Sequence, residues 1–396
     1  MVRLTGPCER INMARIGKYA SDGVDVKLGD LFSAFCGQIC RGSYHNSPFV
    51  DIVDLSSGRF RGPRGFTLKN LAPGCIHTIG ADGIGTKTIL SVAAGYPEWA
   101  AYDLVAMTAM DIVRGGGLPL GLSNIMDVKS LGDGPDSETY RYCIRAMEGL
   151  GRVAGKNGLF ILNGETAELG PCISSEDPNA ILSFNWGSVM YGVYHPQKMI
   201  YGNTLAPGQV VIALREKGFR SNGISSVRKA LAIKYGPEWY KNSEALPDIV
   251  AAAAPSAQYD GFLSHMHGWT MMKGFQLGPL VKMHLIVHLS GGAFESKLGE
   301  DMLAPQGLSA NLEHLFDPPE IMRKCAEWRG LSGEECYNTW SGGQGALVVV
   351  DEHDADFVLG TAPQFGIDAK AAGEIQTKQK YTVRIVSKFD GSEVTY

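Results

Sequence analysis

Short apolar runs beside glycine-rich turns recur along the chain, and this pattern predicts buried strands that lead into tight turns. The runs span residues 75–79, 159–162, 208–214, 283–289 and 346–350. Between them, apolar residues spaced three or four apart predict amphipathic helices. These helices span residues 103–114, 137–157 and 225–235. The chain therefore mixes strands and helices along its whole length.

The ends of the predicted helices carry local signals. Asp103 is placed to cap the first of them, and the glycines at 115–117 are placed to end it. Gly158 is a plausible stop for the second helix. The remaining assignments are a helix-like pattern in 17–41, a long loop or hairpin over 42–74, a helix or extended element over 86–94, and strands over 119–128 and 181–194.

The length of 396 residues predicts two domains, since one hydrophobic core rarely serves so long a chain. The pattern of residues along the sequence changes near residues 196–207. We therefore expect an N-terminal domain over 1–200 and a C-terminal domain over 208–396. The 50 glycines exceed the usual share of about 7%. Without a collagen-like period, this excess indicates many tight turns and close backbone approaches.

Charge and hydropathy narrow the range of partners. The net charge is −5 and no basic block stands out, so nucleic acid is not an expected partner. No apolar run approaches the 18 residues of a membrane span, and residues 1–16 lack the apolar core of a signal peptide. The eight cysteines are scattered, which argues against zinc and for free thiols in a reducing compartment. We expect a cytoplasmic protein without a membrane partner.

The stretch 79–87 carries the first candidate chemistry. Glycines let a backbone approach phosphate oxygens, Asp82 can ligate Mg²⁺, and Thr86 and Lys87 can contact oxygens. The spacing is not that of a Walker A loop. Alone, the same Asp-Gly pair also fits a plain tight turn between two strands.

Three further candidates for a functional site also have a purely structural interpretation. Asp111 shares a helix face with apolar residues, so it either ligates a metal or lies at the edge of the apolar stripe. Glu165 follows a strand and a glycine turn, which fits a metal or substrate role or an acidic first turn of a helix. Ser221 and Asn222 precede a helix, where they either cap it or hold an anion. His284 and His288 lie four apart but lack the glutamate of a zinc protease helix.

Several of these motifs occur in a fixed order over about residues 17–350. They are Gly23-Val24-Asp25, Asp82-Gly83-Ile84-Gly85-Thr86-Lys87, the helix from Asp103 through Asp111, Gly164-Glu165-Thr166-Ala167-Glu168, Ser221-Asn222-Gly223 and His288-Leu289-Ser290-Gly291-Gly292. In this order and spacing the chain resembles the phosphoribosylformylglycinamidine cyclo-ligase family, the aminoimidazole ribonucleotide synthetases of purine biosynthesis. The superfamily also holds thiamine-monophosphate kinase and a hydrogenase-maturation dehydratase, but stretches 164–168 and 221–223 favour the cyclo-ligases.

The resemblance implies an α+β fold of two domains, with an N-terminal sheet that pairs across a homodimer and a sandwich-like C-terminal domain. ATP and Mg²⁺ would bind chiefly at the N-terminal domain, and a small ribonucleotide would bind between the domains. The implied enzyme activates the formamide oxygen of its substrate as a phosphate ester. An amidine nitrogen then attacks, phosphate leaves and the imidazole ring closes.

The resemblance also implies roles for particular residues. Mg²⁺ would bind Asp82, Asp111 and Glu165, and the nucleotide would contact the 82–87 stretch and Asp111. Catalysis would involve Lys87, Asp111 and His288. The residues implied on the substrate side are Glu165, Ser221, Asn222, Gly223, Gly291 and Gly292.

Four departures from the family pattern leave open which substrate accepts the phosphoryl group of ATP. Met110 stands where the family has Asn, Arg220 where it often has His, Ala257 where it has Arg, and Ser341 where it has Asn. The motifs implied to bind the nucleotide are thus better preserved than those implied to bind the substrate. The alternatives are an enzyme of the same superfamily that phosphorylates another amide, carbonyl or small molecule, and a nucleotide-binding dimer without catalysis. Nothing in the sequence assigns a role to residues 42–74 or identifies a general base.

Overall fold

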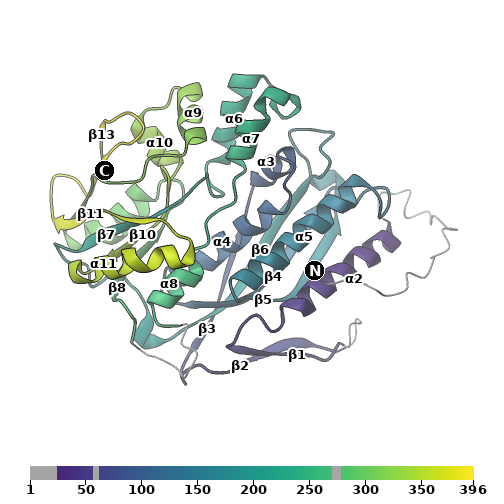
Figure 1. The fold of residues 1–396 in the computed structure, drawn as a ribbon, viewed down its shortest axis with the longest axis horizontal. Helices are drawn as coiled ribbons and strands as arrows, with labels where there is room; N and C mark the ends of the chain where they lie inside the picture. The colour runs from purple at the N-terminus through teal and green to yellow at the C-terminus, as the bar shows by residue number, and fades with distance from the viewer. Residues whose placement is uncertain (1–24, 57–61, 270–277) are drawn as a thin grey trace.

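The computed structural model describes residues 25–56, 62–269 and 278–396, and it contains three β-sheets (Figure 1). The smallest is the hairpin of β1 (Val50–Asp54) and β2 (Arg64–Leu68). It confirms the hairpin alternative for part of residues 42–74. The motif at residues 23–25 lies outside the described residues except for Asp25, whose carboxylate caps α2 (Val26–Ser43).

The N-terminal sheet has four strands in the order β3-β6-β4-β5. They are β3 (Ile76–Gly83), β4 (Leu118–Val128), β5 (Phe160–Glu168) and β6 (Phe184–Tyr194). Helices α2, α4 (Trp99–Val113) and α5 (Glu138–Lys156) cover one face and bury one shared apolar core with it (Figure 1). Because β3, β4 and β5 run in the same direction, their carboxyl ends meet at one edge of the sheet.

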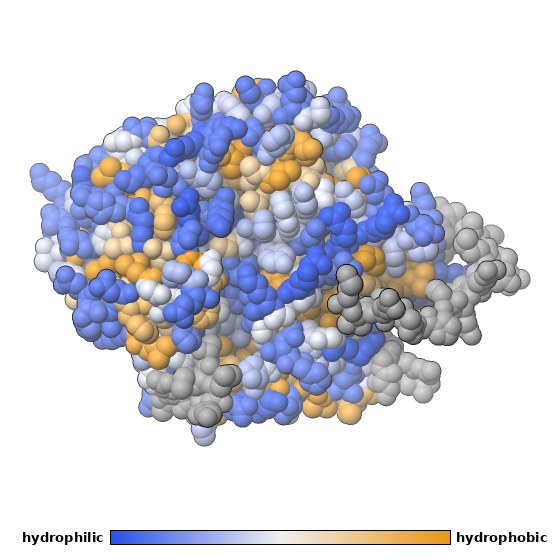
Figure 2. Space-filling view, viewed as in Figure 1, coloured by the Kyte–Doolittle hydropathy of each residue, from blue (hydrophilic) through white to orange (hydrophobic). Residues whose placement is uncertain are grey.

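The opposite face of this sheet carries apolar side chains in solvent. The exposed fractions are 67% for Ile79 and 53% for Ile125. Single exposed apolar residues are common on proteins, but here they lie on two strands of one sheet, and β3 is its edge. Figure 2, which draws one face of the molecule, shows mainly hydrophilic residues interrupted by several apolar patches.

The C-terminal sheet has seven strands in the order β13-β12-β9-β11-β7-β10-β8. They are β7 (Val210–Arg215), β8 (Met283–His288), β9 (Leu308–Leu312), β10 (Gln344–Val350), β11 (Ala369–Thr377), β12 (Val383–Val386) and β13 (Glu393–Thr395). Alternate residues of β7 and β10 point into different cores, so both faces of the sheet are covered. One cover contains α8 (Asp260–Met266) and α11 (Glu352–Thr361), and the other contains the π-helix η5 (Phe294–Leu303).

The remaining helices join the two halves of the chain. Helices α6 (Ile224–Tyr235), α7 (Leu246–Ala252), α9 (Glu320–Arg329) and α10 (Gly333–Thr339) share a core with α3 (Lys87–Ala93). Met110 and Val113 of α4 likewise pack in the core beneath β7, β8 and β10. Met110 is therefore apolar because it fills an apolar core between the two large sheets. These sheets draw their strands from either side of residues 195–209, while the boundary near 200 stays a prediction.

Most predicted elements are present, with differences at their ends. Asp82 and Glu165 lie within β3 and β5 and not in turns, because the ladders continue past the glycines. Asp103 was wrongly predicted as a helix cap: α4 starts at Trp99, and Asp103 is a buried interior residue. The helix alternative for residues 86–94 is confirmed by α3. Among the described residues, no helix is long and apolar enough to cross a membrane.

Candidate functional site between the two large sheets

Two carboxylates meet where β3 packs against α4. A methyl group on Gly80 would lie 3.2 Å from Cβ of Asp111, so the glycine allows strand and helix to approach closely. Asp82 lies two residues along β3, on the same face as Gly80. Burial raises the pKa of Asp111, and the neighbouring charge of Asp82 adds to the rise, while Arg114 opposes it. The structure thus brings together the two residues predicted as the main metal ligands.

The chemistry of this pair fits Mg²⁺. Two neighbouring carboxylates are stabilised by a hard cation that prefers oxygen ligands. Asp82 Oδ1 accepts a hydrogen bond from the Gly83 amide at 2.7 Å, which orients the carboxylate. Arg114 Nε lies 3.6 Å from Asp111 Oδ1 and partly balances the charge.

Glu165 lies apart from this pair. In the sheet register, Asp82, Ser188, Asn124 and Gly164 form one row across the four strands. Glu165 is in the next row and therefore points to the opposite face. Three strand spacings, about 14 Å in total, separate β3 from β5. Within one chain, Glu165 does not join Asp82 and Asp111 in one coordination sphere, so its metal role stays a prediction.

Glu165 instead borders a cavity between α2 and β5. The cavity has a volume of about 620 Å³, which is enough for a nucleotide-sized ligand. Its wall includes apolar Phe32 and Met147 as well as the cations Arg41 and Arg64. This combination of apolar and cationic lining suits a ligand with a flat ring and an anionic group.

Lys87 lies in a buried ion pair. Its Nζ is 2.7 Å from Asp103 Oδ1 and 2.8 Å from the carbonyl oxygen of Ala254, and the side chain is 1% exposed. Asp103 also accepts a hydrogen bond from the Ser256 amide at 3.0 Å. A contact between Lys87 and phosphate stays a prediction, and it would require the ammonium to leave Asp103. Thr86, by contrast, is exposed beside Gly85, which has a φ of +52°.

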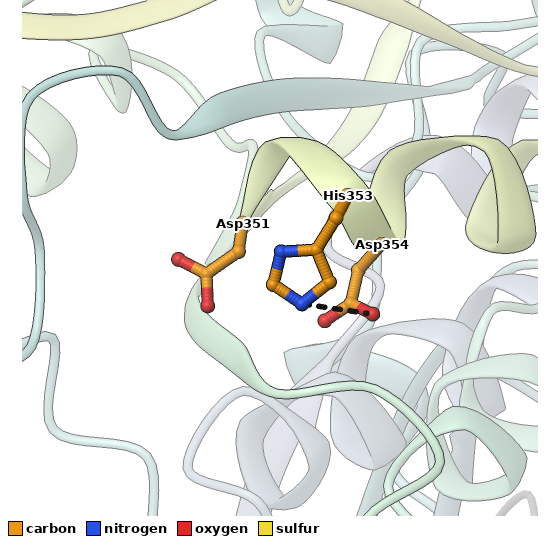
Figure 3. Close-up of side chains that lie close together, drawn as sticks. All are labelled: Asp351, His353 and Asp354. Atoms are coloured by element: carbon orange, nitrogen blue, oxygen red, sulfur yellow. Dashed lines mark ion pairs between the residues drawn. The ribbon is translucent and has the colours of Figure 1, made fainter.

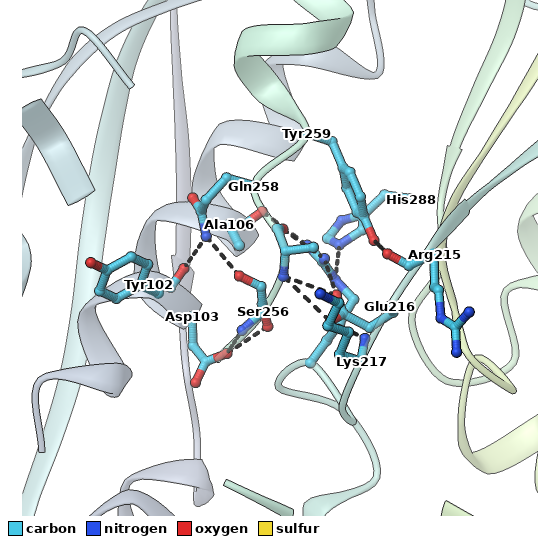
Figure 4. A network of polar contacts seen from close by, with 12 residues as sticks. Tyr102, Asp103, Ala106, Arg215, Glu216, Lys217, Ser256, Gln258, Tyr259 and His288 are labelled. Atoms are coloured by element: carbon cyan, nitrogen blue, oxygen red, sulfur yellow. Dashed lines mark hydrogen bonds and ion pairs between the residues drawn. The ribbon is translucent and has the colours of Figure 1, made fainter. Parts of the chain in front are cut away.

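Arg220 forms a second buried network, drawn in part in Figure 4. Its guanidinium lies 2.8 Å from Glu216 Oε2 and donates to the carbonyl oxygen of Ala106 in α4 at 3.2 Å. The backbone φ of Arg220 is +51°, a conformation that costs a non-glycine residue energy. The amide of Ala257 donates to the Glu216 carboxylate. Two positions that depart from the family pattern, 220 and 257, thus belong to one network.

His288 is also part of this network. Arg220 Nε donates to His288 Nε2 at 3.2 Å, so that nitrogen acts as an acceptor. Burial, and then the charges of Arg220 and Lys297, hold the pKa of His288 well below its usual value. The side chain is buried and neutral, which suits a positioning role near the site.

Three loops of the C-terminal half converge beside this network. A methyl group on Gly223 would meet the Thr339 carbonyl oxygen at 2.6 Å, and one on Gly291 would meet the same oxygen at 3.3 Å. The loops 221–223, 290–292 and 339–343 therefore pack against one another. Within them, the buried polar atoms Ser221 Oγ, Asn222 Nδ2 and Ser341 Oγ have no hydrogen-bond partner in the described structure. Buried groups of this kind call for an explanation such as a ligand or water, so these loops are candidate substrate contacts.

Sequence reasoning missed Lys297 and Arg114. Lys297 lies on η5 and donates to Ser290 Oγ at 2.6 Å, which places it at the 290–292 loop. Arg114 follows the last turn of α4, three residues after Asp111. The spacing to Asp111 could have indicated Arg114, but no local signal indicates Lys297.

A further cluster of possible metal ligands lies elsewhere. Ligand atoms of Asp351, His353 and Asp354 lie within 4.8 Å of one another at the start of α11 (Figure 3). Asp351 Oδ1 is 3.0 Å from His284 Nε2. Acidic residues are favoured at a helix N-terminus, whereas the helix dipole opposes a cation there. The cluster therefore fits a helix start better than a metal centre.

The chain is similar to known proteins in sequence. Residues 70–185 match the family model described as AIR synthase related protein, N-terminal domain. The phosphoribosylformylglycinamidine cyclo-ligase of Oceanobacillus iheyensis is 27% identical over 84% of this chain and 86% of its own. That of Prochlorococcus marinus is 24% identical over 94% and 98%. The chain is thus similar to these enzymes over most of its length.

Solved structures show the same fold at lower identity. The hydrogenase maturation protein HypE of E. coli has a TM-score of 0.57 at 16% identity, and the match covers 93% of this chain and 96% of HypE. A structure of HypE in complex with ATP has a TM-score of 0.53 at 14% identity, covering 86% and 89%. The chain therefore shares the mixed α+β fold of these structures. The family-model match over residues 70–185 and the similarity to cyclo-ligases over most of the chain confirm the resemblance seen in the motifs.

The buried pair predicts a stability phenotype for Lys87. Changing Lys87→Met leaves Asp103 buried without its counter-ion, which costs about 3 to 5 kcal/mol of unfolding free energy. The double variant Lys87→Met/Asp103→Leu should recover a large part of this loss, as measured by urea unfolding. A Lys87→Met protein of unchanged stability would contradict a structural ion pair and favour a phosphate contact.

Proposed function

We propose that the chain catalyses the ATP-dependent ring closure of formylglycinamidine ribonucleotide to aminoimidazole ribonucleotide, with release of ADP and phosphate. The observation that carries this proposal is the pair of carboxylates, Asp82 and Asp111, beside a set of convergent polar loops. The similarity to named cyclo-ligases over most of the chain supports the reaction type. HypE binds ATP on a similar fold, which supports nucleotide use.

The proposed roles follow the location of each group. Asp82 and Asp111 hold Mg²⁺, which would neutralise charge on the triphosphate. The backbone around Gly83 and Gly85 and the exposed Thr86 hydroxyl bind phosphate oxygens. In this proposal the sugar and base lie towards the cavity between α2 and β5, where Glu165 contacts the ligand.

On the other side, Ser221 and Asn222 orient the substrate through the polar atoms that lack partners. Gly223, Gly291 and Gly292 keep the loop backbone close to it, and buried His288 positions Arg220 and the loop that follows. The formamide oxygen of the substrate attacks the terminal phosphoryl group of ATP, and ADP leaves. The amidine nitrogen then attacks the activated carbon, the C–O bond to phosphate breaks, and a proton is lost as the ring closes.

A second candidate is phosphorylation of a different amide, carbonyl or small-molecule oxygen by the same machinery. The buried Arg220–Glu216 network favours it, because it occupies positions where the family has other residues. A nucleotide-binding dimer without catalysis is the third candidate. All three place the protein in the cytoplasm, and none needs a nucleic acid or a membrane.

The direct test supplies purified protein with formylglycinamidine ribonucleotide, ATP and Mg²⁺ and measures aminoimidazole ribonucleotide and ADP. We expect both products in equal amounts. ADP release that depends on another amide or carbonyl compound would select the second candidate. Nucleotide binding without ADP release under any of these conditions would select the third.

The carboxylate pair predicts a sharp loss of activity. Asp82→Asn or Asp111→Asn should lower kcat by about 100-fold or more, because each removes an anionic ligand of the Mg²⁺ that would neutralise charge on the triphosphate. Asp127→Asn is a matched control, since Asp127 lies in the same sheet and points to the opposite face. Equal effects of all three changes, measured by ADP release, would argue against a special role of the pair.

We further propose that the exposed apolar face of the N-terminal sheet pairs with a second copy. Ile79 is 67% exposed on edge strand β3, where an apolar face and unpaired backbone groups favour association. Ile79→Glu should shift the protein towards a monomer in analytical ultracentrifugation. Ile233→Glu changes an isoleucine of similar exposure, 54%, on α6 and should leave the association state unchanged. A monomeric wild-type protein would refute the proposal.

A further inference from the structure

Lys297 is a cation of the site region that has no ion pair with a carboxylate in the described part of the chain. It extends from η5, a ten-residue π-helix, a rare conformation that often marks functional sites. Its Nζ lies 2.6 Å from Ser290 Oγ and 3.4 Å from the His288 carbonyl oxygen. Both partners are neutral oxygens. In the described structure, the ammonium makes no direct ion pair with Asp82 or Asp111.

Four other cations of the site region are each paired with a carboxylate in the described structure. Lys87 is held by Asp103, Arg220 by Glu216 and Arg114 by Asp111. Arg228 of α6 is 3.2 Å from Glu176. Each of these ions would have to give up a partner before it could bind an incoming anion. Lys297 would only exchange weak hydrogen bonds to neutral oxygens for a charge-assisted one.

The charge of Lys297 nevertheless interacts with those of Asp82 and Asp111. Burial, and then the charge of Arg114, lower the pKa of Lys297, and the charges of Asp111 and Asp82 oppose part of that lowering. The influence is mutual, since Lys297 also lowers the pKa of Asp111. Lys297 comes from the C-terminal half and the carboxylates from the N-terminal half, so charges from both halves of the chain interact in this region.

We propose that Lys297 changes its electrostatic partner during nucleotide binding. Without metal, its ammonium is the long-range counter-ion of Asp82 and Asp111. Once Mg²⁺ is held by these carboxylates, Lys297 binds a phosphate oxygen of the nucleotide, from the side of the 290–292 loop. This inference rests on the proposed use of Mg·ATP and adds a phosphate-binding residue that the sequence motifs do not contain.

The proposal predicts effects of opposite sign from one substitution. In Lys297→Met, the carboxylate pair loses a competing cation, so binding of Mn²⁺ alone, measured by electron paramagnetic resonance, should tighten about 3-fold. The same change removes a phosphate contact, so calorimetric binding of the non-hydrolysable analogue AMPPCP with Mg²⁺ should weaken about 10-fold. Lys297→Arg should retain most of the AMPPCP affinity.

Lys282→Met is the matched control, since Lys282 is exposed just before β8, and it should alter neither measurement. Far-UV circular dichroism and urea unfolding show whether each variant is folded. AMPPCP binding that is unchanged in a folded Lys297→Met protein overturns the proposal, as does a parallel weakening of both Mn²⁺ and AMPPCP. Failure of the wild-type protein to bind AMPPCP would instead refute the nucleotide-dependent function, and this inference with it.

Discussion

The relation between the two halves of the molecule depends on buried charges that must stay paired. Lys87 at the start of α3 and Asp103 inside α4 form an ion pair that also holds the chain at Ala254 and Ser256. Removing such charges from water is costly, and only direct contact and hydrogen bonds offset that cost. The pair is therefore satisfied only when the 254–256 loop lies against α3 and α4. This requirement fixes where the C-terminal half can sit on the N-terminal half.

The Arg220 network also fixes the C-terminal half against the N-terminal half. Its guanidinium reaches the Ala106 carbonyl oxygen in α4, while Glu216 accepts hydrogen bonds from the amide of Ala257. Apolar packing reinforces both networks, because Met110 and Leu90 of the N-terminal half lie in cores built mainly by the C-terminal half. A rigid boundary of this kind can hold groups from both halves at fixed separations. Such preorganisation is what phosphoryl transfer requires of a protein.

Some cations near the site are paired with carboxylates and others are not, and this difference has a functional consequence. Lys87, Arg220 and Arg228 are held by carboxylates, so they shape the site and carry little free charge. The charge available to a ligand comes from groups held less tightly, such as Lys297, and from backbone amides in glycine turns. The chain thus departs from the cyclo-ligase pattern in a coordinated way. Positions 220 and 257, which both differ from the family pattern, both contact Glu216, the first through its guanidinium and the second through its backbone amide.

The sequence by itself determined most helices and strands, because apolar periodicity and glycine placement are local properties. The class of fold and the pairing of Asp82 with Asp111 came from the order of motifs that resembles a known family. The sequence did not determine that Asp103 is buried, that Glu165 faces away from Asp82, or that Lys297 approaches the site. Those facts depend on strand register and on contacts between residues far apart, as between Lys87 and Ala254. A one-residue step in a strand reverses the face of a side chain, and no local pattern records which segment will pair with a buried charge. Only the tertiary structure decided which acids form a site and which cations remain free to bind.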